Sequence, residues 1–329
     1  MVARLRPKTV APVITNPNTS ATTSANHTKR VIGFCVGRGF FLCRCGQHTT
    51  TSVAIRGQLG HNPATVKGML NSDSLRDTTS RLLLDDGMRD EQDAYGHEIM
   101  NFLNYKPGFE EIERDDGTVL LSGGPQMYFD PFRRWPVQTR QAMRFVRGRV
   151  LDVGSGARRH ASHLQERGYD VLCIDNSLLA LEVCRRRGVR ETREMSVYQV
   201  SRTLGIFDTI IMMGGNLALL ADVDRGKRLL ERLDRITSHR ARIVGETRDP
   251  HQPDDPIHAA YHESNRQRGK IAGQVKIRVR YGQYVGAWFD YMLVSSDELR
   301  DVLEGPNWTL RRTIDSDGPE YVAIIEKKF

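Results

Sequence analysis

Short continuous apolar runs mark the buried strands of this chain. The clearest runs are 150–153, 171–174, 207–213 and 241–246, and a weaker one falls within 191–200. Runs that lack polar alternation are typical of strands covered on both faces. Amphipathic segments separate the runs, and strands that alternate with helices predict a mostly parallel α/β sheet.

Three segments between these strands have the spacing and the end signals of helices. They are 157–167, 178–187 and the region around 223–237. The first two stop at Gly168 and Gly188, because glycine readily takes the left-handed conformation that closes a helix. Ser177 precedes the second helix and can accept a hydrogen bond from a free amide of its first turn.

The first strand leads directly into Gly154-Ser155-Gly156. Glycine suits this turn because the backbone needs positive φ and must approach a ligand without a Cβ atom in the way. The second strand ends in Asp175, nineteen residues after Gly156. A carboxylate there is placed to accept hydrogen bonds from ribose hydroxyls. These residues predict the nucleotide-binding half of a Rossmann-like sheet.

Three details indicate which nucleotide the turn holds. A dinucleotide fingerprint needs a third glycine where this chain has Arg159, and the Gly-Lys-Ser/Thr of a phosphate cradle is missing from this turn. Asp152, just before the glycines, would repel a pyrophosphate but suits a ligand with an ammonium group and no phosphate. S-adenosylmethionine is such a ligand, and its carboxylate is suited to the amides of a helix N-terminus.

The motifs DVGSGA (152–157), CIDNS (173–177) and FDTIIMMGGN (207–216) resemble those of class I S-adenosylmethionine-dependent methyltransferases. From about Asp93 onward the chain is also similar to small bacterial proteins of the methyltransferase-domain group. The resemblance implies a Rossmann-like, doubly wound sheet of seven strands, mostly parallel with an antiparallel C-terminal strand. The residues expected to bind S-adenosyl-L-methionine are Asp152, Gly154, Ser155, Gly156, Asp175, Asn176, Gly214 and Asn216. The chain departs from many relatives at Arg158, where they have a further glycine.

The pattern divides the chain into three predicted parts. Residues 1–87 read as a poorly ordered basic extension, with a targeting segment and a mis-assigned start as alternatives. Residues 88–147 form a cap with a helix near its start and a hairpin around Asp115-Asp116-Gly117. Residues 148–329 form the cofactor-binding domain.

The aromatic residues Tyr128, Phe129 and Trp135 of the cap are candidate walls of the cofactor site, with plain packing as the alternative. In the cofactor-binding domain, 273–294 reads as an inserted hairpin. Its residues Lys276, Arg278 and Arg280 share one face, which either attracts an acidic substrate or is solvated. A capping box at 295–298 starts the last helix. The resemblance implies a terminal antiparallel strand pair after it.

Charge and cysteine content limit the classes of binding partner and the compartment that we expect for this chain. Residues 1–72 contain nine Lys and Arg and no acid, whereas the other 257 residues carry 39 basic and 40 acidic side chains. A near-neutral domain argues against a nucleic-acid partner. Five cysteines in 329 residues favour a reducing compartment, and we expect a cytoplasmic location. The longest apolar run is too short to span a bilayer.

Two groups of metal-ligand residue types are weak signals. Cys35, Cys43, Cys45 and His48 have a spacing that fits no recognised zinc site, so chance clustering is preferred. His258 and His262 lie four apart but lack a third ligand at a fixed spacing. We therefore expect no metal.

The expected cofactor indicates the type of reaction, but it does not identify the methyl acceptor. Glu246, Asp249 and His251 lie at or past the end of a strand and are the candidates for acceptor-side catalysis. We expect a methyltransferase that acts on a small molecule. A cofactor-binding pseudoenzyme or regulatory module is the alternative, and a nicotinamide oxidoreductase is disfavoured by Arg159 and by the terminal strand pair. The oligomeric state stays open.

Overall fold

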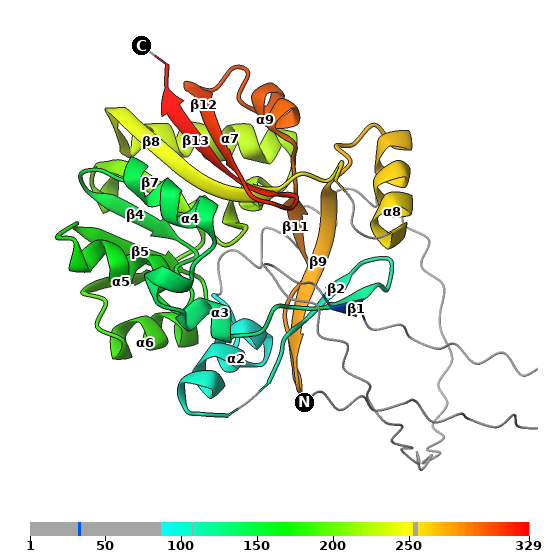
Figure 1. The fold of residues 1–329 in the computed structure, drawn as a ribbon, viewed down its shortest axis with the longest axis horizontal. Coiled ribbons are helices and arrows are strands. Elements are labelled where there is room, and N and C mark those ends of the chain that lie inside the picture. Colours follow the sequence, from blue (N-terminus) through cyan, green and yellow to red (C-terminus); the bar gives the residue numbers. More distant parts are fainter. Residues whose placement is uncertain (1–31, 34–86, 107, 253–255, 329) are drawn as a thin grey trace, which may run out of the picture. The chain divides into compact units, whose positions relative to one another are not determined.

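The computed structural model describes residues 32–33, 87–106, 108–252 and 256–328, which are coloured in Figure 1. Nearly all of the predicted N-terminal extension, with the cluster of Cys35, Cys43, Cys45 and His48, lies outside the described residues.

The larger of two sheets has seven strands and confirms the predicted α/β fold. Its strands are β4 (Val150–Val153), β5 (Val171–Asp175), β6 (Glu191–Glu194), β7 (Phe207–Met212), β8 (Thr237–Arg248), β12 (Trp308–Asp315) and β13 (Glu320–Lys327). Their order is β12-β13-β8-β7-β4-β5-β6 (Figure 1). The strands from β4 to β8 pair in parallel, and β13 lies antiparallel between β8 and β12.

Alternate side chains of the main sheet enter two apolar layers. Leu151 and Val153 face the layer under α7 (Val223–Arg235) and α9 (Ser296–Val302). Val150 faces the layer under α4 (Val137–Ala142), α5 (Arg159–Glu166) and α6 (Leu178–Arg186). Helices on both faces explain why the strand sequences are continuously apolar.

Two predicted boundaries were wrong. The helix expected at 157 starts at Arg159, because Arg158 has a φ of 71° and cannot continue a right-handed helix. The strand expected at 241–246 begins at Thr237, and the preceding helix ends at Arg235. The apolar pattern did not indicate this extension because β8 begins with four polar residues, Thr237, Ser238, His239 and Arg240.

Arg158→Gly should be more stable than Arg158→Ala by about 1 kcal/mol, because a Cβ atom at left-handed φ costs roughly 1–2 kcal/mol. Both variants lose the hydrogen bond from Arg158 to Ser162, so the comparison isolates the backbone strain. At Glu166, exposed in the last turn of α5, the order should reverse, since glycine costs about 0.5–1 kcal/mol relative to alanine in a helix. Urea denaturation measures both differences. An Arg158→Ala variant as stable as the glycine variant would contradict the strain.

The smaller sheet contains strands from two segments that the sequence analysis treated as separate hairpins. Its strands are β1 (Ile32–Gly33), β2 (Glu111–Arg114), β3 (Val119–Leu121), β9 (Gln274–Tyr281), β10 (Tyr284–Val285) and β11 (Phe289–Met292). β2 pairs antiparallel with both β3 and β9, and β11 pairs with β9. The hairpin around Asp115 and the one within 273–294 therefore form a single sheet.

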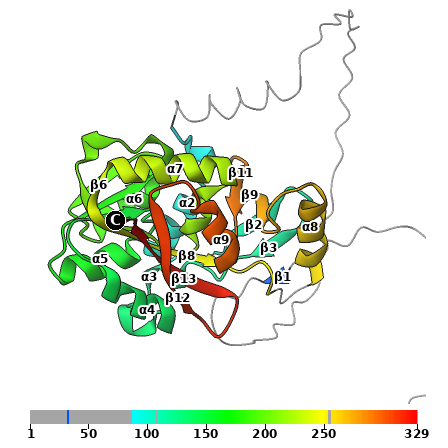
Figure 2. The same cartoon turned by 90° about the horizontal axis from the view of Figure 1, so that it is seen from above.

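The second sheet lies beside the main sheet in both Figure 1 and Figure 2, with α8 (Pro256–Gln267) beyond it. Two of its cations are matched by an acid, because Glu113 Oε2 is 2.9 Å from Arg278 Nη2 and 2.8 Å from Arg280 Nη1. These arginines are thus neither an unmatched attractor for acidic substrates nor a purely solvated face.

Candidate functional site

The turn after β4 has the backbone that its glycines predicted. Gly154 has a φ of 66° and Gly156 a φ of 51°. The Gly154 amide donates to the carbonyl of Ile174 in β5 at 2.9 Å, which fixes the start of the turn to the neighbouring strand. Ser155 is buried beside Cys184, with 3.6 Å between its hydroxyl oxygen and the Cys184 sulfur.

Asp175 holds the turn from the end of β5. Its Oδ2 accepts from the Gly156 amide and its Oδ1 from the Ser177 amide, each at 3.0 Å. Burial raises the pKa of Asp175 to about 6. Each carboxylate oxygen has a second lone pair, so Asp175 can accept further hydrogen bonds from a ligand. Asn176, the next residue, is exposed at the strand end.

Asp152 supplies a second buried acid beneath the turn. Asp152 is 1% exposed, and its Oδ2 atom has no hydrogen-bond partner among the described residues. Burial and the nearby charge of Asp175 raise the pKa of Asp152 to about 7. A buried carboxylate without a partner favours a positively charged ligand over a phosphate.

Asn216 also binds to the turn. Its side-chain amide donates to the carbonyls of Val153 and Gly154, each at 3.0 Å. A Cβ atom at Gly154 would collide with this amide. Asn216 begins η6 (Asn216–Leu220) after β7, so it ties the end of β7 to the end of β4. The described contacts therefore give Asn216 a positioning role.

The tip of β7 has one open side and one covered side. A Cβ atom at Gly214 would meet no heavy atom within 4 Å, whereas one at Gly215 would meet the hydroxyl of Tyr291. Tyr291 comes from β11 and donates to the Gly215 carbonyl. The second sheet therefore contacts the carboxyl end of the main sheet, where ligands of open α/β sheets bind.

Glu246 lies beside this tip. Its Oε2 accepts from the Gly214 amide at 2.7 Å and its Oε1 from the Thr139 hydroxyl at 3.2 Å. Burial raises the pKa of Glu246, opposed by the Gly214 hydrogen bond and by the charge of Arg159. The carboxyl group is thus held in one orientation next to the glycines of the β7 tip.

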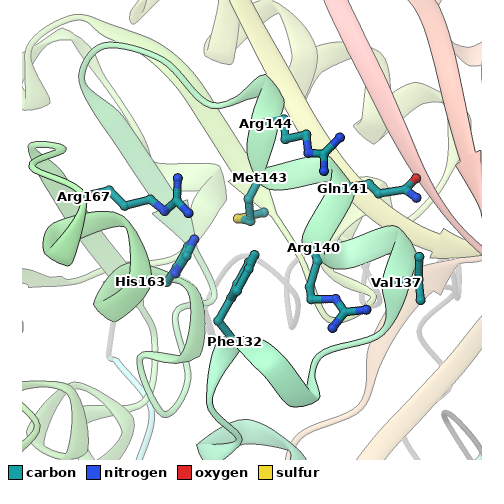
Figure 3. A pocket seen from close by; sticks show the side chains of 8 residues that line it. All are labelled: Phe132, Val137, Arg140, Gln141, Met143, Arg144, His163 and Arg167. Atoms are coloured by element: carbon teal, nitrogen blue, oxygen red, sulfur yellow. The ribbon is translucent and has the colours of Figure 1, made fainter.

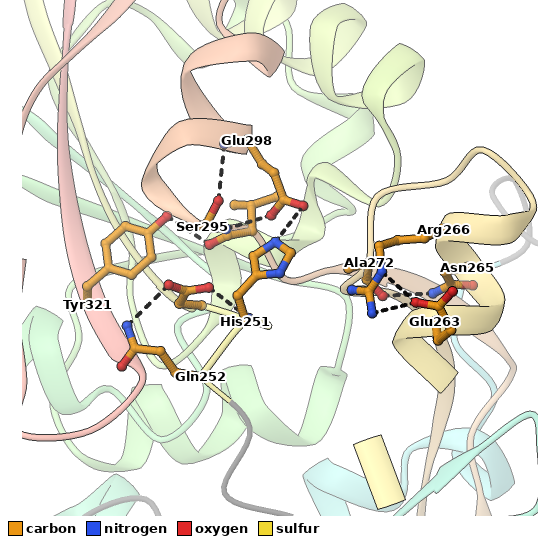
Figure 4. Close-up of polar contacts among 11 residues, drawn as sticks. His251, Gln252, Glu263, Asn265, Arg266, Ala272, Ser295, Glu298 and Tyr321 are labelled. Carbon is orange, nitrogen blue, oxygen red and sulfur yellow. Dashed lines mark hydrogen bonds and ion pairs between the residues drawn. The ribbon is translucent and has the colours of Figure 1, made fainter. Parts of the chain in front are cut away.

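Asp249 and His251 belong to a different polar cluster, of which Figure 4 labels His251, Gln252 and Glu298. Asp249 accepts from the His251 amide at 2.8 Å and from the Gln252 side chain at 3.2 Å. The His251 ring lies 3.1 Å from Glu298 at the start of α9. Among the described residues, no hydrogen bond or ion pair links this cluster to Glu246 or to the glycine turn.

Helix α2 (Ala94–Leu103) closes over the turn, which the sequence did not indicate. Asp93 caps α2 and accepts from the Ser177 hydroxyl at 2.7 Å, so the helix is tied to the start of α6. The Tyr95 hydroxyl occupies the position that a Cβ atom of Gly156 would need. Burial and the charges of Glu110 and Asp175 raise the pKa of Tyr95.

Two more buried acids lie behind Tyr95. Glu98 is 1% and Glu110 3% exposed, and the Glu110 amide donates to Glu98 at 2.9 Å. Tyr128, which packs edge-on against Tyr95, donates to Glu110 at 2.9 Å. Burial and mutual repulsion raise the pKa of Glu98, and burial raises that of Glu110. The region behind the turn is therefore poor in compensating positive charge.

The other two aromatic candidates have packing partners. Phe129 lies under the guanidinium of Arg187 at 4.4 Å. Trp135 is 3% exposed in the apolar layer and donates to the Asp130 carbonyl at 2.8 Å. His258, a considered metal ligand, is 3.0 Å from Arg114. No group of three metal-ligating side chains occurs in the described part of the chain.

Comparison with known proteins agrees with this geometry. Residues 151–244 match the family model of the methyltransferase domain. A search of curated proteins finds no match to the sequence. The S-adenosylmethionine-dependent methyltransferase of Bacteroides fragilis, solved with S-adenosyl-L-homocysteine, is 21% identical over 74% of this chain and 98% of its own, with a TM-score of 0.63. The CcbJ methyltransferase of Streptomyces caelestis is 14% identical over 73% and 100% of the two chains, with a TM-score of 0.48. Residues 151–244 therefore match a methyltransferase domain, and the chain shares its fold with the Bacteroides fragilis structure.

Proposed function

We propose that the chain transfers a methyl group from S-adenosyl-L-methionine to a small-molecule acceptor. The observation that carries this proposal is the buried pair Asp152 and Asp175 around a glycine turn, with one Asp152 oxygen lacking a partner among the described residues. A ligand with a sulfonium and an ammonium group supplies the missing positive charge, and its ribose supplies hydroxyl donors. A diphosphate would add negative charge to the same place.

The residues have separate roles in this proposal. Asp175 binds the ribose hydroxyls while holding the Gly156 amide. Gly154 and Gly156 let the backbone approach the ligand, and Asp152 provides an electrostatic contact to its amine. Tyr95 covers the turn, and its hydroxyl makes no hydrogen bond to a described residue, so it is available to the ligand's carboxylate. Ser155 and Asn176 border the turn and the strand end.

The bound cofactor supplies an electrophilic methyl group with a good leaving group. The protein then has to hold the acceptor in line, which can lower a barrier by about 7–11 kcal/mol. The open side of Gly214 gives room for the acceptor. Glu246, fixed beside it and with a raised pKa, is placed to accept a proton from a hydroxyl or ammonium acceptor. Asp249 and His251 stay predictions for acceptor-side catalysis.

The acceptor class follows from the surroundings of the β7 tip. Tyr291 covers the Gly215 side of this tip and leaves the Gly214 side open, and we propose an acceptor small enough to reach it there. In the described part of the chain no helix is long and apolar enough to cross a membrane. Cys173 and Cys184 are free and buried, and we propose that the protein acts in the cytoplasm.

The test of the proposal is formation of S-adenosyl-L-homocysteine across a panel of hydroxyl, amine and thiol acceptors. We expect turnover with at least one acceptor and a decrease of roughly 10²–10⁴-fold in kcat for Glu246→Gln when that acceptor needs deprotonation. Cofactor affinity should be retained in this variant. Binding of cofactor without turnover across the panel would contradict the proposal and favour a binding module.

Cofactor affinity should rise with pH between 5 and 8. The pKa values of Asp175 and Asp152 are raised to about 6 and about 7, so protons occupy these groups at low pH and must leave when a cationic ligand binds. S-adenosylmethionine has a positively charged sulfur and S-adenosylhomocysteine does not. The affinity of S-adenosylmethionine should therefore depend more steeply on pH. Calorimetry in buffers of different ionisation enthalpy measures the released protons. Asp152→Asn should remove most of the dependence above pH 6, and a pH-independent affinity in the unmodified protein would refute the linkage.

A further inference from the structure

A cavity of about 440 Å³ lies on the α4–α5 side of the main sheet (Figure 3). His163 of α5 and Arg167, the residue after this helix, line one side, and Arg140 and Arg144 line the other. Phe132 and Met143 lie between them. The cavity is lined by the C-terminal half of α5, whereas the glycine turn precedes the N-terminal end of that helix.

The three arginines of this cavity have no acidic partners. None forms an ion pair with a described Asp or Glu, and the Arg140 guanidinium donates only to the Arg133 carbonyl, at 3.0 Å. Arg144 and Arg167 are exposed. On α6, by contrast, Arg185 and Arg186 both pair with Glu182. No ion pair within the described structure therefore balances these three arginines.

His163 adds a polar atom without a protein partner. Its ring stacks on Phe132 with 4.0 Å between centroids and 2° between planes. Its Nε2 atom is buried and has no hydrogen-bond partner among the described residues. Burial and, to a lesser extent, the charge of Arg167 lower the pKa of His163, and the charge of Glu166 opposes this shift. A bound anion would balance the positive charge of Arg167 beside this ring.

We propose that this cavity binds a small ligand carrying two or more phosphate groups, at a site separate from the methyl-transfer crevice. Guanidinium groups match phosphate oxygens with paired hydrogen bonds, and Arg140, Arg144 and Arg167 all line this cavity. The volume lies within the range of small-molecule sites, about 300–1,000 Å³. The Phe132 ring gives the ligand one apolar contact surface. The buried acids Asp152 and Asp175 would repel the same chemistry, so the two proposed sites select opposite charges.

Calorimetric titration with inorganic pyrophosphate at constant ionic strength tests this site. We expect saturable binding of one pyrophosphate per chain and at least a tenfold weaker affinity in the double variant Arg144→Gln/Arg167→Gln. The matched control Arg185→Gln/Arg186→Gln removes the same charge from α6 and should stay within twofold of the unmodified protein. Because both cavity arginines are exposed, the double variant should keep its melting temperature, and Arg144→Gln alone should give an intermediate affinity.

Three outcomes would overturn the proposal: non-saturable binding, no binding, or an equal loss in the two double variants. The last result would mean that only the net charge of the protein matters. The variant Gly154→Val separates this site from the cofactor crevice, because it should retain pyrophosphate binding. Loss of pyrophosphate binding in Gly154→Val would place the anion in the crevice and also contradict the proposed selectivity of the glycine turn.

Discussion

Gly154→Val is expected to abolish measurable binding of S-adenosyl-L-homocysteine, with a decrease in affinity of at least about 100-fold, or roughly 2.7 kcal/mol. Two effects act together. A β-branched residue at a φ of 66° is strained by about 1–3 kcal/mol. Its Cβ atom would also displace the Asn216 amide that joins the β4 and β7 ends, so the turn itself must move. Calorimetry with the purified variant gives the affinity.

Gly168→Val is the matched control for this substitution. Gly168 has a φ of 86° at the end of α5, and a Cβ atom there would meet no heavy atom within 4 Å. The control has the backbone strain without the collision and lies away from the turn. It should lower the melting temperature and leave cofactor affinity unchanged. Equal loss of affinity in both variants would mean that global destabilisation, and not the turn, causes the effect.

Asp175→Ala should weaken cofactor binding by about 1–3 kcal/mol, which is roughly 5- to 150-fold. The ribose hydroxyls lose their acceptor, and the amides of Gly156 and Ser177 lose the oxygens that orient them. Asp175→Asn retains one oxygen and should lie between alanine and the unmodified protein. Calorimetry gives the affinity of S-adenosylhomocysteine for the two variants and the unmodified protein, and so tests this order of affinities.

Asp170→Ala is the control for the loss of an acid near β5. Asp170 is exposed and pairs with Arg149 at 3.0 Å, just before the strand begins and far along it from Asp175. Its removal should leave the affinity within twofold. An unchanged affinity in Asp175→Ala would remove Asp175 from the cofactor site.

The main sheet was predictable because its information is local. The apolar runs of β4 and β5 and the serine cap of α6 identify these elements from a few neighbouring residues, and the structure confirms them. Arg158 is a position whose backbone conformation the neighbouring residues did not predict. Its left-handed backbone shortens α5, although a non-glycine residue rarely adopts that conformation.

The second sheet could not be predicted because its pairing joins distant segments. Strand alternation in β2 and β9 indicates which side chains share a face, but it does not name the partner strand. Glu113 lies more than 160 residues from Arg278 and Arg280, and its charge match becomes visible only after the strands pair. Two hairpins were therefore expected where the chain forms one sheet.

The candidate site likewise contains residues that a local motif predicts and residues that come from distant segments. Gly154, Gly156 and Asp175 form one short motif, and the structure brings them together. Tyr95 and Tyr291 reach the strand ends from segments on either side of that motif, and no spacing rule connects them to it. The sequence identifies Arg159 only as a departure from a glycine motif, yet its buried charge opposes the rise in the pKa of Glu246 that burial causes.

Native mass spectrometry of the protein mixed with equal concentrations of S-adenosylhomocysteine, NADH and ATP tests the central claim most directly. Two buried acids at a glycine turn should select the nucleoside that has an amine and no phosphate. We predict a single adduct with the mass of S-adenosylhomocysteine, which disappears in Gly154→Val. An adduct with NADH or ATP that depends on the same glycine, or no nucleoside adduct, would contradict the account.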